Sequence, residues 1–427
     1  MSSAPEAAEI LRRCDLLATQ SSRRGAIERV YLSPEHAAVN RIVGAWMAEA
    51  GMTVRQDEAG NLVGRYEASV HGRPALLLGS HLDSVPDAGR YDGILGVLLA
   101  IATVARLASA DRRLPVAIEV LAFGDEEGTR FGATLLGSRA VAGTWREDWW
   151  ALRDADGVTL AEAFRAFGLD PAAVGAAART PADVVGYLEA HIEQGPLLED
   201  AGLPLAVVSS IAGARRLRLT VTGEARHAGG TPFDRRRDAL VGASEIVVAI
   251  ERIARATGAI ATVGTMEVEP GAVNVIPGRA AFGLDLRAET DALRDEAWRL
   301  IRDEAVHVCR RRGLGFDAHE THAAGAAIAS PALRDAVSRG IAAATGDGEP
   351  PVLFSKAGHD AMAIADLTDW AMLFVRCAGG ISHHPDESVA EADVAVALDA
   401  FEAAVVDAAL AAGAELDPGT GETGAGA

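Results

Sequence analysis

Short apolar runs that stop abruptly at metal-binding residue types are the feature that most limits how this chain can fold. Residues 74–78 read Pro-Ala-Leu-Leu-Leu, and Gly-Ser-His-Leu-Asp-Ser-Val follows at 79–85. An apolar run this short, bounded by Pro and Gly, is typical of a buried strand, and open α/β sheets bind ligands at the edge where such strands end. The pattern predicts an α/β fold with His81 at that edge, although a single histidine near a strand end is more often a hydrogen-bonded structural residue.

Carboxylates follow His81 and also follow a second strand-like run. Asp83 comes two residues after His81 and faces the same way on an extended chain, so its carboxylate can accept the second ring proton and fix the tautomer. Another apolar run at 116–123 ends in Gly-Asp-Glu-Glu-Gly at 124–128. Adjacent carboxylates repel each other, and a cation beside them would offset the repulsion. The alternative is a solvated acidic turn.

Three further segments carry the same residue types. Asp92 precedes Gly93, residues 189–196 read Glu-Ala-His-Ile-Glu-Gln-Gly-Pro, and residues 379–387 read Gly-Gly-Ile-Ser-His-His-Pro-Asp-Glu. All of them lie at predicted strand ends or in glycine-rich loops, so a shared site is predicted. Nitrogen and oxygen ligands without cysteine fit a pair of borderline or hard divalent ions such as zinc or manganese, and cobalt or nickel also suit them.

The pattern of elements changes in the middle of the chain, and 427 residues exceed what one hydrophobic core usually supports. The expected elements there are strands at 217–222, 261–268, 280–287 and 314–320 and helices at 238–257 and 291–312. The order β-α-β-β-α-β is that of a ferredoxin-like unit. We expect a catalytic domain at 1–212 and 325–412, with a mixed sheet flanked by helices, and an inserted α+β domain at 213–324. Residues 413–427 are glycine-rich and are expected to be disordered.

Charge and cysteine content limit the partners and the cellular location. The formal charge is −20, from 60 acidic and 40 basic residues, which argues against nucleic acid or an anionic membrane surface as a partner. No run is long and apolar enough for a transmembrane helix, and residues 1–19 lack the core of a signal peptide, so a cytoplasmic protein is expected. Cys14, Cys309 and Cys377 are scattered and are interpreted as small buried apolar residues.

Eight segments together carry a family resemblance. They are GSHLDSVPDAGRYDG, GDEEGTRF, EAHIEQGP, ARHAGGTPFDRRRDA, PGAVNVIPG, DLR, AGHDAM and GISHHPDE. In these segments the chain resembles the dinuclear metallopeptidase and amidohydrolase family that includes allantoate amidohydrolases, N-carbamoyl-L-amino acid hydrolases and β-ureidopropionases. The resemblance extends from about Arg13 to about Leu410.

The resemblance implies a metallopeptidase-like catalytic domain that holds two divalent ions in each subunit. One ion would be held by His81 and His191, the other by Glu127 and His383, and Asp92 would bridge both. Glu126 would be the general base that activates water. A second histidine, His384, stands beside His383 where the family has a small or amide residue. His383 is taken as the ligand because it occupies the histidine position of the family pattern Ser-His-x-Pro.

The same resemblance makes the inserted domain a lid and dimerisation module that binds substrate. Arg216, Asn274 and Arg287 would hold a substrate carboxylate, a task that suits the forked guanidinium group. His227 would reach into the site of the other subunit and polarise the scissile carbonyl. The pocket would be completed by Gln194, Gly358 and His359. Each residue also has an ordinary structural interpretation, as a solvated arginine, a turn-forming asparagine or a capping histidine.

The expected substrate is a small anionic ureido or amide compound. Two adjacent arginines, Arg215 and Arg216, resemble the allantoate enzymes, which favours allantoate hydrolysis with ammonia release; N-carbamoyl-L-amino acids are the alternative. Lys356 replaces the usual small residue and leaves the specificity open. Two other classes are weighed: a metal-free binding protein, disfavoured by the complete ligand set, and a peptidase, disfavoured because His191 stands where many peptidases have a carboxylate.

Overall fold

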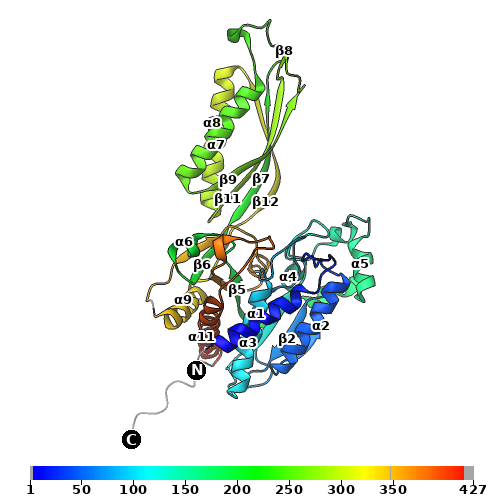
Figure 1. Cartoon of the computed structure of the whole chain (residues 1–427), viewed down its shortest axis with the longest axis vertical. Helices are drawn as coiled ribbons and strands as arrows, with labels where there is room; N and C mark the ends of the chain where they lie inside the picture. Colours follow the sequence, from blue (N-terminus) through cyan, green and yellow to red (C-terminus); the bar gives the residue numbers. More distant parts are fainter. Residues whose placement is uncertain (1–2, 347, 418–427) are drawn as a thin grey trace. The chain divides into compact units, whose positions relative to one another are not determined.

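The computed structural model describes residues 3–346 and 348–417, which divide into two compact units (Figure 1). Unit 1 contains the described residues up to Ser209, Ala329–Leu353 and those from Gly358 onward. Unit 2 contains Ser210–Ile328 together with Phe354–Ala357. Unit 2 is therefore inserted into the sequence of unit 1.

Unit 1 is built on a mixed sheet. Its strands are β1 (Thr53–Gln56), β2 (Leu62–Tyr66), β3 (Ala75–His81), β4 (Ala117–Phe123), β5 (Val184–Ile192), β6 (Leu205–Ile211), β14 (Val352–Ser355) and β15 (Trp370–Val375). The order is β1-β2-β4-β3-β5-β15-β6, followed by the short β13 (Ala327–Ile328), and β14 also pairs with β6. The pairs β3–β4, β3–β5 and β5–β15 are parallel, whereas β2–β4 and β6–β15 are antiparallel. The predicted mixed sheet is confirmed.

Helices cover this sheet and bury its strands. They are α1 (Ala4–Ala18), α2 (Pro34–Glu49), α3 (Ile94–Ser109), α4 (Leu136–Val141), α5 (Leu160–Phe167), α6 (Leu197–Ala201), α9 (Pro331–Thr345), α10 (Ala361–Ile364) and α11 (Glu391–Leu416). β3 and β4 are buried along their whole length, as continuous apolar strands of a covered parallel sheet should be. None of the helices within the described ranges combines the length and apolar character needed to cross a lipid bilayer.

The C-terminal helix corrects one predicted boundary. α11 continues to Leu416, so residues 413–416 are helical and do not belong to a disordered tail. Gly413 lies inside this helix, where a side chain would collide with Pro115. The remainder of the predicted tail, residues 418–427, lies outside the described residues.

The parallel strands bring the predicted metal-binding segments to one edge. β3 ends at His81, β4 ends just before the acidic segment 124–128, and His191 is the last residue but one of β5. Parallel strands end at the same edge of a sheet, and ligands of open α/β sheets bind there. The fold thus places these three segments side by side.

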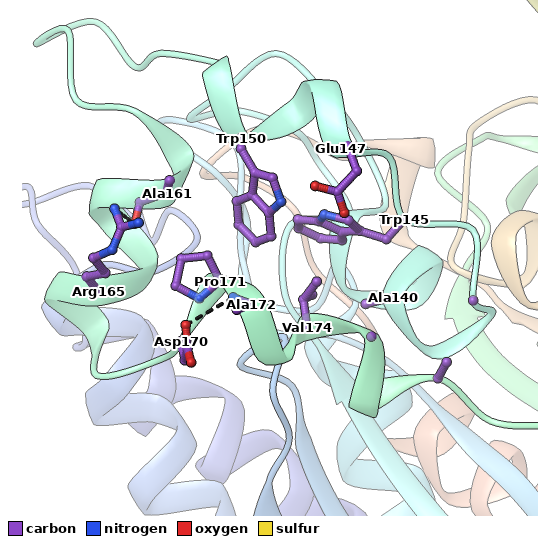
Figure 2. Close-up of a pocket in the computed structure, with 13 residues that line it drawn as sticks. Ala140, Trp145, Glu147, Trp150, Ala161, Arg165, Asp170, Pro171, Ala172 and Val174 are labelled. Carbon is purple, nitrogen blue, oxygen red and sulfur yellow. Dashed lines mark hydrogen bonds between the residues drawn. The ribbon is translucent and has the colours of Figure 1, made fainter.

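A smaller aromatic cluster is formed by residues of the segment between α4 and β5. Trp145 contacts Trp150 with ring centroids 4.9 Å apart, and Trp150 contacts Phe164 edge to face at the same separation. Beside the two tryptophans lies a pocket of about 660 Å³, with Glu147 and Arg165 among its lining residues (Figure 2). None of the predicted site residues lines this pocket, so its aromatic contacts are interpreted as packing.

Unit 2 has the ferredoxin-like order of elements. The elements are β7 (Gly213–Thr222), α7 (Ala239–Thr257), β9 (Ile260–Glu269), β11 (Arg279–Ala288), α8 (Asp291–Arg312) and β12 (Gly315–Ala324). The sheet order is β12-β7-β11-β9, and α7 and α8 lie side by side on one of its faces (Figure 1). The short strands β8 (Arg226–His227) and β10 (Val275–Ile276) pair with each other. The other face of the sheet is left to polar side chains.

The contact between α3 and β5 yields a stability prediction. A Cβ on Gly96 of α3 would lie 2.0 Å from the main-chain oxygen of Ala190, next to His191. We expect Gly96→Ala to lower the free energy of unfolding by about 1–3 kcal/mol, as overpacking typically does. Gly44→Ala in α2 is the matched control, because its Cβ would meet only side chains at 3.5 Å. The free energy of unfolding of the control variant should rise by up to about 1 kcal/mol, because alanine has a higher helix propensity than glycine.

Unfolding in denaturant, followed by circular dichroism with metal held constant, measures both variants. Equal stability of the two alanine variants would contradict the proposed close contact between α3 and β5.

Candidate metal centre

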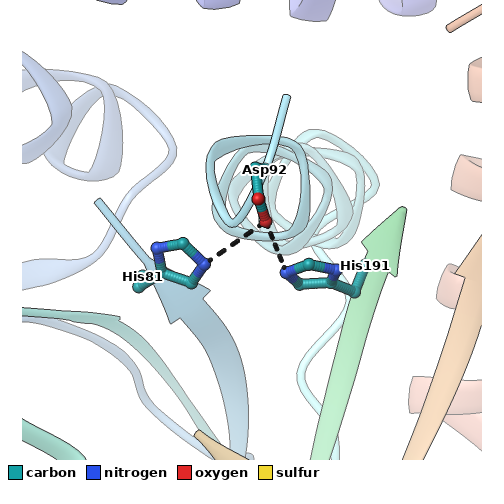
Figure 3. Close-up of side chains that lie close together, drawn as sticks. All are labelled: His81, Asp92 and His191. Atoms are coloured by element: carbon teal, nitrogen blue, oxygen red, sulfur yellow. Dashed lines mark ion pairs between the residues drawn. The ribbon is translucent and has the colours of Figure 1, made fainter. Parts of the chain in front are cut away.

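Asp92 lies between two histidines that end neighbouring strands. Asp92 Oδ1 is 3.6 Å from His81 Nε2 and 3.2 Å from His191 Nε2, and all three side chains are buried (Figure 3). Asp92 is carried by the turn before α3, where Gly93 adopts a positive φ of 69°. A side chain at Gly93 would strike the ring of His81, which explains why glycine follows Asp92.

The tautomers of both histidines leave Nε2 available. His81 Nδ1 lies 3.1 Å from the main-chain oxygen of Asp83, and His191 Nδ1 lies 2.9 Å from that of Ile192. A carbonyl oxygen only accepts hydrogen bonds, so each Nδ1 donates and each Nε2 can bind a cation. His81, Asp92 and His191 offer ligand atoms within 4.8 Å of one another, so this group fits a divalent metal ion.

The other oxygen of Asp92 faces a second group of ligands. Asp92 Oδ2 is 3.1 Å from His383 Nε2, which is 3.5 Å from Glu127 Oε1. These three residues also bring ligand atoms within 4.8 Å of one another. His384 lies outside this group, because its Nδ1 accepts a hydrogen bond from the main chain of Asp386. The structure therefore brings all five predicted metal ligands together around Asp92.

The electrostatics of the cluster call for positive charge. Burial and the nearby Asp92 raise the pKa of Glu127 to about 7, although His81 and His383 oppose the shift. Burial also raises the pKa of Glu126 well above its ordinary value. The hydrogen bond to Asp92 raises the pKa of His383 to about 9. Cations bound between these groups would take the place of protons and offset the cost of burying the carboxylates.

Asp83 supports the acidic turn that carries Glu126 and Glu127. Its two carboxylate oxygens accept hydrogen bonds from the main-chain N–H groups of Glu126 and Glu127, at 3.1 and 3.2 Å. The carboxylate is 3.6 Å from His81 Nδ1, so the nearer acceptor for that ring is the main-chain oxygen of Asp83 and not the carboxylate, contrary to expectation. Asp83 thus fixes the positions of both glutamates as well as His81.

Two residues that the sequence analysis passed over also hold Asp92 in place. Glu387 Oε1 accepts hydrogen bonds from the main-chain N–H groups of Tyr91 and Asp92, at 2.8 and 3.2 Å. Ser382 donates to Glu387 at 2.9 Å and lies 3.2 Å from Asp92 Oδ2. Glu387 is only 3% exposed and joins the turn of Asp92 to the loop of His383. The motif Ser-His-His-Pro-Asp-Glu contained both residues, but only the folded contact reveals what they do.

The residues predicted to line the pocket in unit 1 lie close to the metal ligands. Gln194 Nε2 donates to Asp92 Oδ2 at 2.9 Å and is 3.4 Å from His383 Nε2. The ring of buried His359 stands edge to face with that of His191, with centroids 4.3 Å apart. Gly358 precedes His359, and a Cβ there would lie 3.7 Å from Glu126. These three residues surround the same cluster.

In unit 2, the two predicted carboxylate-binding arginines share one aspartate. Arg216 Nε is 3.1 Å from Asp285 Oδ2, and Arg287 Nε is 2.9 Å from Asp285 Oδ1. Arg287 also donates to the main-chain oxygen of Lys356, so Lys356 contributes its backbone here. Arg215 points elsewhere and pairs with Glu320. Of the adjacent residues Arg215 and Arg216, only Arg216 shares Asp285 with Arg287.

The other two predicted residues of unit 2 lie together but away from these arginines. His227 on β8 faces Val275 on β10, and the main-chain oxygen of Asn274 accepts a hydrogen bond from Ala228. β8 follows the Thr222 end of β7 (Figure 1). Arg216 lies toward the beginning of β7. With about 3.3 Å per residue along a strand, the two groups lie near opposite ends of the sheet.

Comparison with known proteins places this arrangement in a family. An N-carbamoyl-L-amino acid amidohydrolase of Geobacillus stearothermophilus is 40% identical over 374 residues, covering 87% of this chain and 91% of the relative. A probable allantoate deiminase of Oryza sativa subsp. japonica is 38% identical over 443 residues, covering 95% and 90%.

A solved structure agrees along nearly the whole chain. The crystal structure of an amidase of the hydantoinase/carbamoylase family from Burkholderia multivorans matches with a TM-score of 0.86 and 32% identity, covering 95% of this chain and 98% of that one. Residues 77–407 match peptidase family M20/M25/M40. The predicted resemblance is confirmed, and the chain belongs to peptidase family M20/M25/M40.

Proposed function

We propose that this protein is a metal-dependent amidohydrolase that cleaves a C–N bond in a small ureido carboxylate, with allantoate as the substrate and ammonia as a product. The observation that carries this proposal is the position of Asp92, with a histidine pair at one oxygen and His383 at the other. The named relatives act on allantoate or on N-carbamoyl-L-amino acids, and the latter are the second candidate substrate.

The metal ions would be two divalent cations, zinc or manganese, with cobalt and nickel as further candidates. Their ligands would be His81, His191, Asp92, Glu127 and His383. When bound, such ions lower the pKa of a water molecule and polarise the carbonyl that it attacks. The ligand set supports two ions because each oxygen of Asp92 belongs to a different group of candidate ligands.

Glu126 would move the proton during the reaction. Its carboxylate stands next to the ligand Glu127 in the sequence and is held by Asp83 through its own main chain. Glu126 would accept a proton from the attacking water and then deliver it to the leaving nitrogen of the ureido group.

The substrate carboxylate would be held by Arg216 and Arg287, with Asn274 of the partner subunit as a further ligand. Asp285 keeps both guanidinium groups in place and lowers the local net charge to that of one cation. Gln194, Gly358 and His359 would line the remainder of the pocket. Arg216 supports the choice of allantoate, because it places a second cation beside Arg287 where apolar substrates would gain nothing.

A second subunit would complete the site. His227 and Asn274 lie near the end of the unit 2 sheet opposite Arg216 and Arg287, so one copy of these residues cannot easily contact the same small molecule. We propose a homodimer formed through unit 2, in which His227 of the partner subunit polarises the scissile carbonyl and stabilises the oxyanion.

Turnover and metal content together test the role of Glu126. Glu126→Gln should retain both ions and the fold but lose about 10²–10⁴-fold in kcat on allantoate, because it removes the proton carrier. Glu127→Gln is the matched control, and it should lose one ion because it changes a ligand. Ammonia release and inductively coupled plasma mass spectrometry measure the two effects. A Glu126→Gln variant with nearly wild-type turnover would remove Glu126 from the mechanism.

The substrate is tested by ammonia release from allantoate and from a panel of N-carbamoyl-L-amino acids, with and without added manganese. A higher kcat/KM for allantoate supports the first candidate. A large preference for any N-carbamoyl-L-amino acid would replace it with the second.

Metal affinity tests the contact between Glu387 and the turn of Asp92. Glu387→Ala removes both acceptor oxygens and should weaken metal binding by about 10–100-fold, as loss of groups that orient a ligand usually does. Exposed Glu391, four residues later, provides the control, and Glu391→Ala should bind metal like the wild type. Competition with a chromophoric chelator measures both. Equal affinities would show that Asp92 keeps its position without Glu387.

Mixed dimers test the proposed action across subunits. His227→Ala and Glu126→Gln homodimers should both be inactive, because each lacks one essential group. After subunit exchange, a heterodimer has one site with both groups intact and should regain up to about half of one dimer's activity. Exchange is verified with two affinity tags. No recovery in verified heterodimers would mean that His227 does not act in the partner's site.

A further inference from the structure

The face of the unit 2 sheet opposite α7 and α8 carries a row of polar side chains. Strand pairing aligns His322 on β12, Arg216 on β7, Asp285 on β11 and Thr262 on β9. The residues that alternate with this row along the strands, such as Leu217, belong to the apolar core and point to the helices. The row therefore spans the sheet on its open face and includes the arginine already assigned to the substrate carboxylate.

Two β-bulges interrupt the strands that flank this row. On β9 the register shifts so that Gly264 has no partner, between Val263 opposite Leu284 and Thr265 opposite Gly283. On β12 the register shifts at Thr321. A bulge puts an extra residue into one strand and changes which side chains share a face. Because of the bulge, Thr262 and Thr265 both project to the open face although they are three residues apart.

A pocket of about 360 Å³ lies between these bulges. It is lined by Arg216, Leu217, Arg218, Thr262, Gly264, Thr265, Gly283, Leu284, Asp285 and Thr321. Leu217 and Leu284 have their side chains buried on the opposite face, with 4% and 2% exposure. The side chains around the pocket are therefore polar. At Gly264 and Gly283, which have no side chain, the main chain itself lines the pocket.

The polar groups of the pocket are a mixture of hydrogen-bond donors and acceptors. Arg216 and Arg218 are 56% and 44% exposed, and they pair with Asp285 and Glu267. The hydroxyls of Thr262 and Thr265 can donate or accept. The ion pairs nearly cancel the charge, so the pocket offers directed hydrogen bonds and little net charge.

A ureido group matches this mixture better than the alternatives. It has a carbonyl oxygen for the arginines and N–H groups for Asp285 and the threonines, and it is uncharged. Arg216, Arg287 and Asp285 together leave one positive charge, which the first substrate carboxylate would neutralise, so a second carboxylate would meet no free cation. An apolar arm would leave the polar groups without partners, which costs binding energy. The volume also lies in the range of small-molecule sites.

We propose that this pocket is a specificity subsite that takes a second, uncleaved ureido arm of the substrate. The inference rests on the proposed function, because Arg216 and Asp285 belong both to this pocket and to the group that would hold the substrate carboxylate. A substrate whose carboxylate and two ureido arms branch from a single carbon can reach both. Allantoate has this form, whereas N-carbamoylglycine is the same acid with one arm missing.

The matched pair of substrates gives the test. Wild-type enzyme should have a kcat/KM at least roughly tenfold higher for allantoate than for N-carbamoylglycine, because only allantoate fills the subsite. The double variant Thr262→Val and Thr265→Val removes two hydroxyls without changing side-chain shape or strand propensity. It should lower the ratio of the two kcat/KM values by roughly tenfold, mainly through KM for allantoate.

Thr220→Val is the control, because Thr220 lies on β7 of the same sheet but does not line the pocket. It should leave the ratio unchanged. A wild type that uses both substrates equally, or a double variant with an unchanged ratio, would overturn the subsite.

Binding separates a failed subsite from a failed function. Isothermal titration calorimetry with metal-loaded Glu126→Gln measures both compounds without turnover. Tighter binding of allantoate that Thr262→Val and Thr265→Val abolish supports the subsite even if neither compound is hydrolysed, in which case the proposed reaction alone is wrong. Equal binding of the two compounds to this variant would overturn the subsite even if allantoate is hydrolysed.

Discussion

The structure of unit 1 depends on the free-energy cost of burying several carboxylates at one edge of its sheet. Asp92, Asp83 and Glu126 are each less than a tenth exposed, and the edge that holds them also ends the parallel strands β3 and β5. Carboxylates this close together cannot all be ionised unless cations lie among them. The histidines around Asp92 can supply that charge as protons, but their Nδ1 contacts with main-chain oxygens leave Nε2 directed at Asp92, the arrangement of metal ligands. Metal binding and the stability of this edge are therefore linked.

The ligand geometry depends on main-chain contacts made by groups outside the ligand set. Asp83 accepts from the main chain of Glu126 and Glu127, and Glu387 accepts from the main chain of Asp92. Each carboxylate thereby holds a turn and leaves the ligand side chains free to bind metal. Because main-chain positions move less than long side chains, such contacts define the spacing of ligands before any ion arrives.

Sequence reasoning located the elements and the segments that hold the candidate ligands because both leave local signals. An apolar run predicts a strand, and the polar residue that ends it, such as His81 or Glu127, is then placed at the sheet edge. The helix at Asp291–Arg312 begins after a capping threonine and ends before a glycine, and its predicted bounds match the structure. The contact between Glu387 and Tyr91 joins residues 296 positions apart and leaves no such signal. The glycine-rich composition of residues 413–427 predicts disorder, yet α11 continues to Leu416, with Gly413 packed against Pro115.

The two units carry opposite local charges, and this has a consequence for an anionic substrate. The whole chain has a formal charge of −20, which would repel such a molecule, but salt screens this repulsion beyond about 10 Å. Attraction must then come from groups within contact distance. In the proposed function, unit 2 would supply these groups as Arg216 and Arg287, whose mutual repulsion Asp285 offsets. In unit 1 the carboxylates around Asp92 would repel an anion until cations are bound. Under the proposed function, metal binding would therefore precede the binding of an anionic substrate.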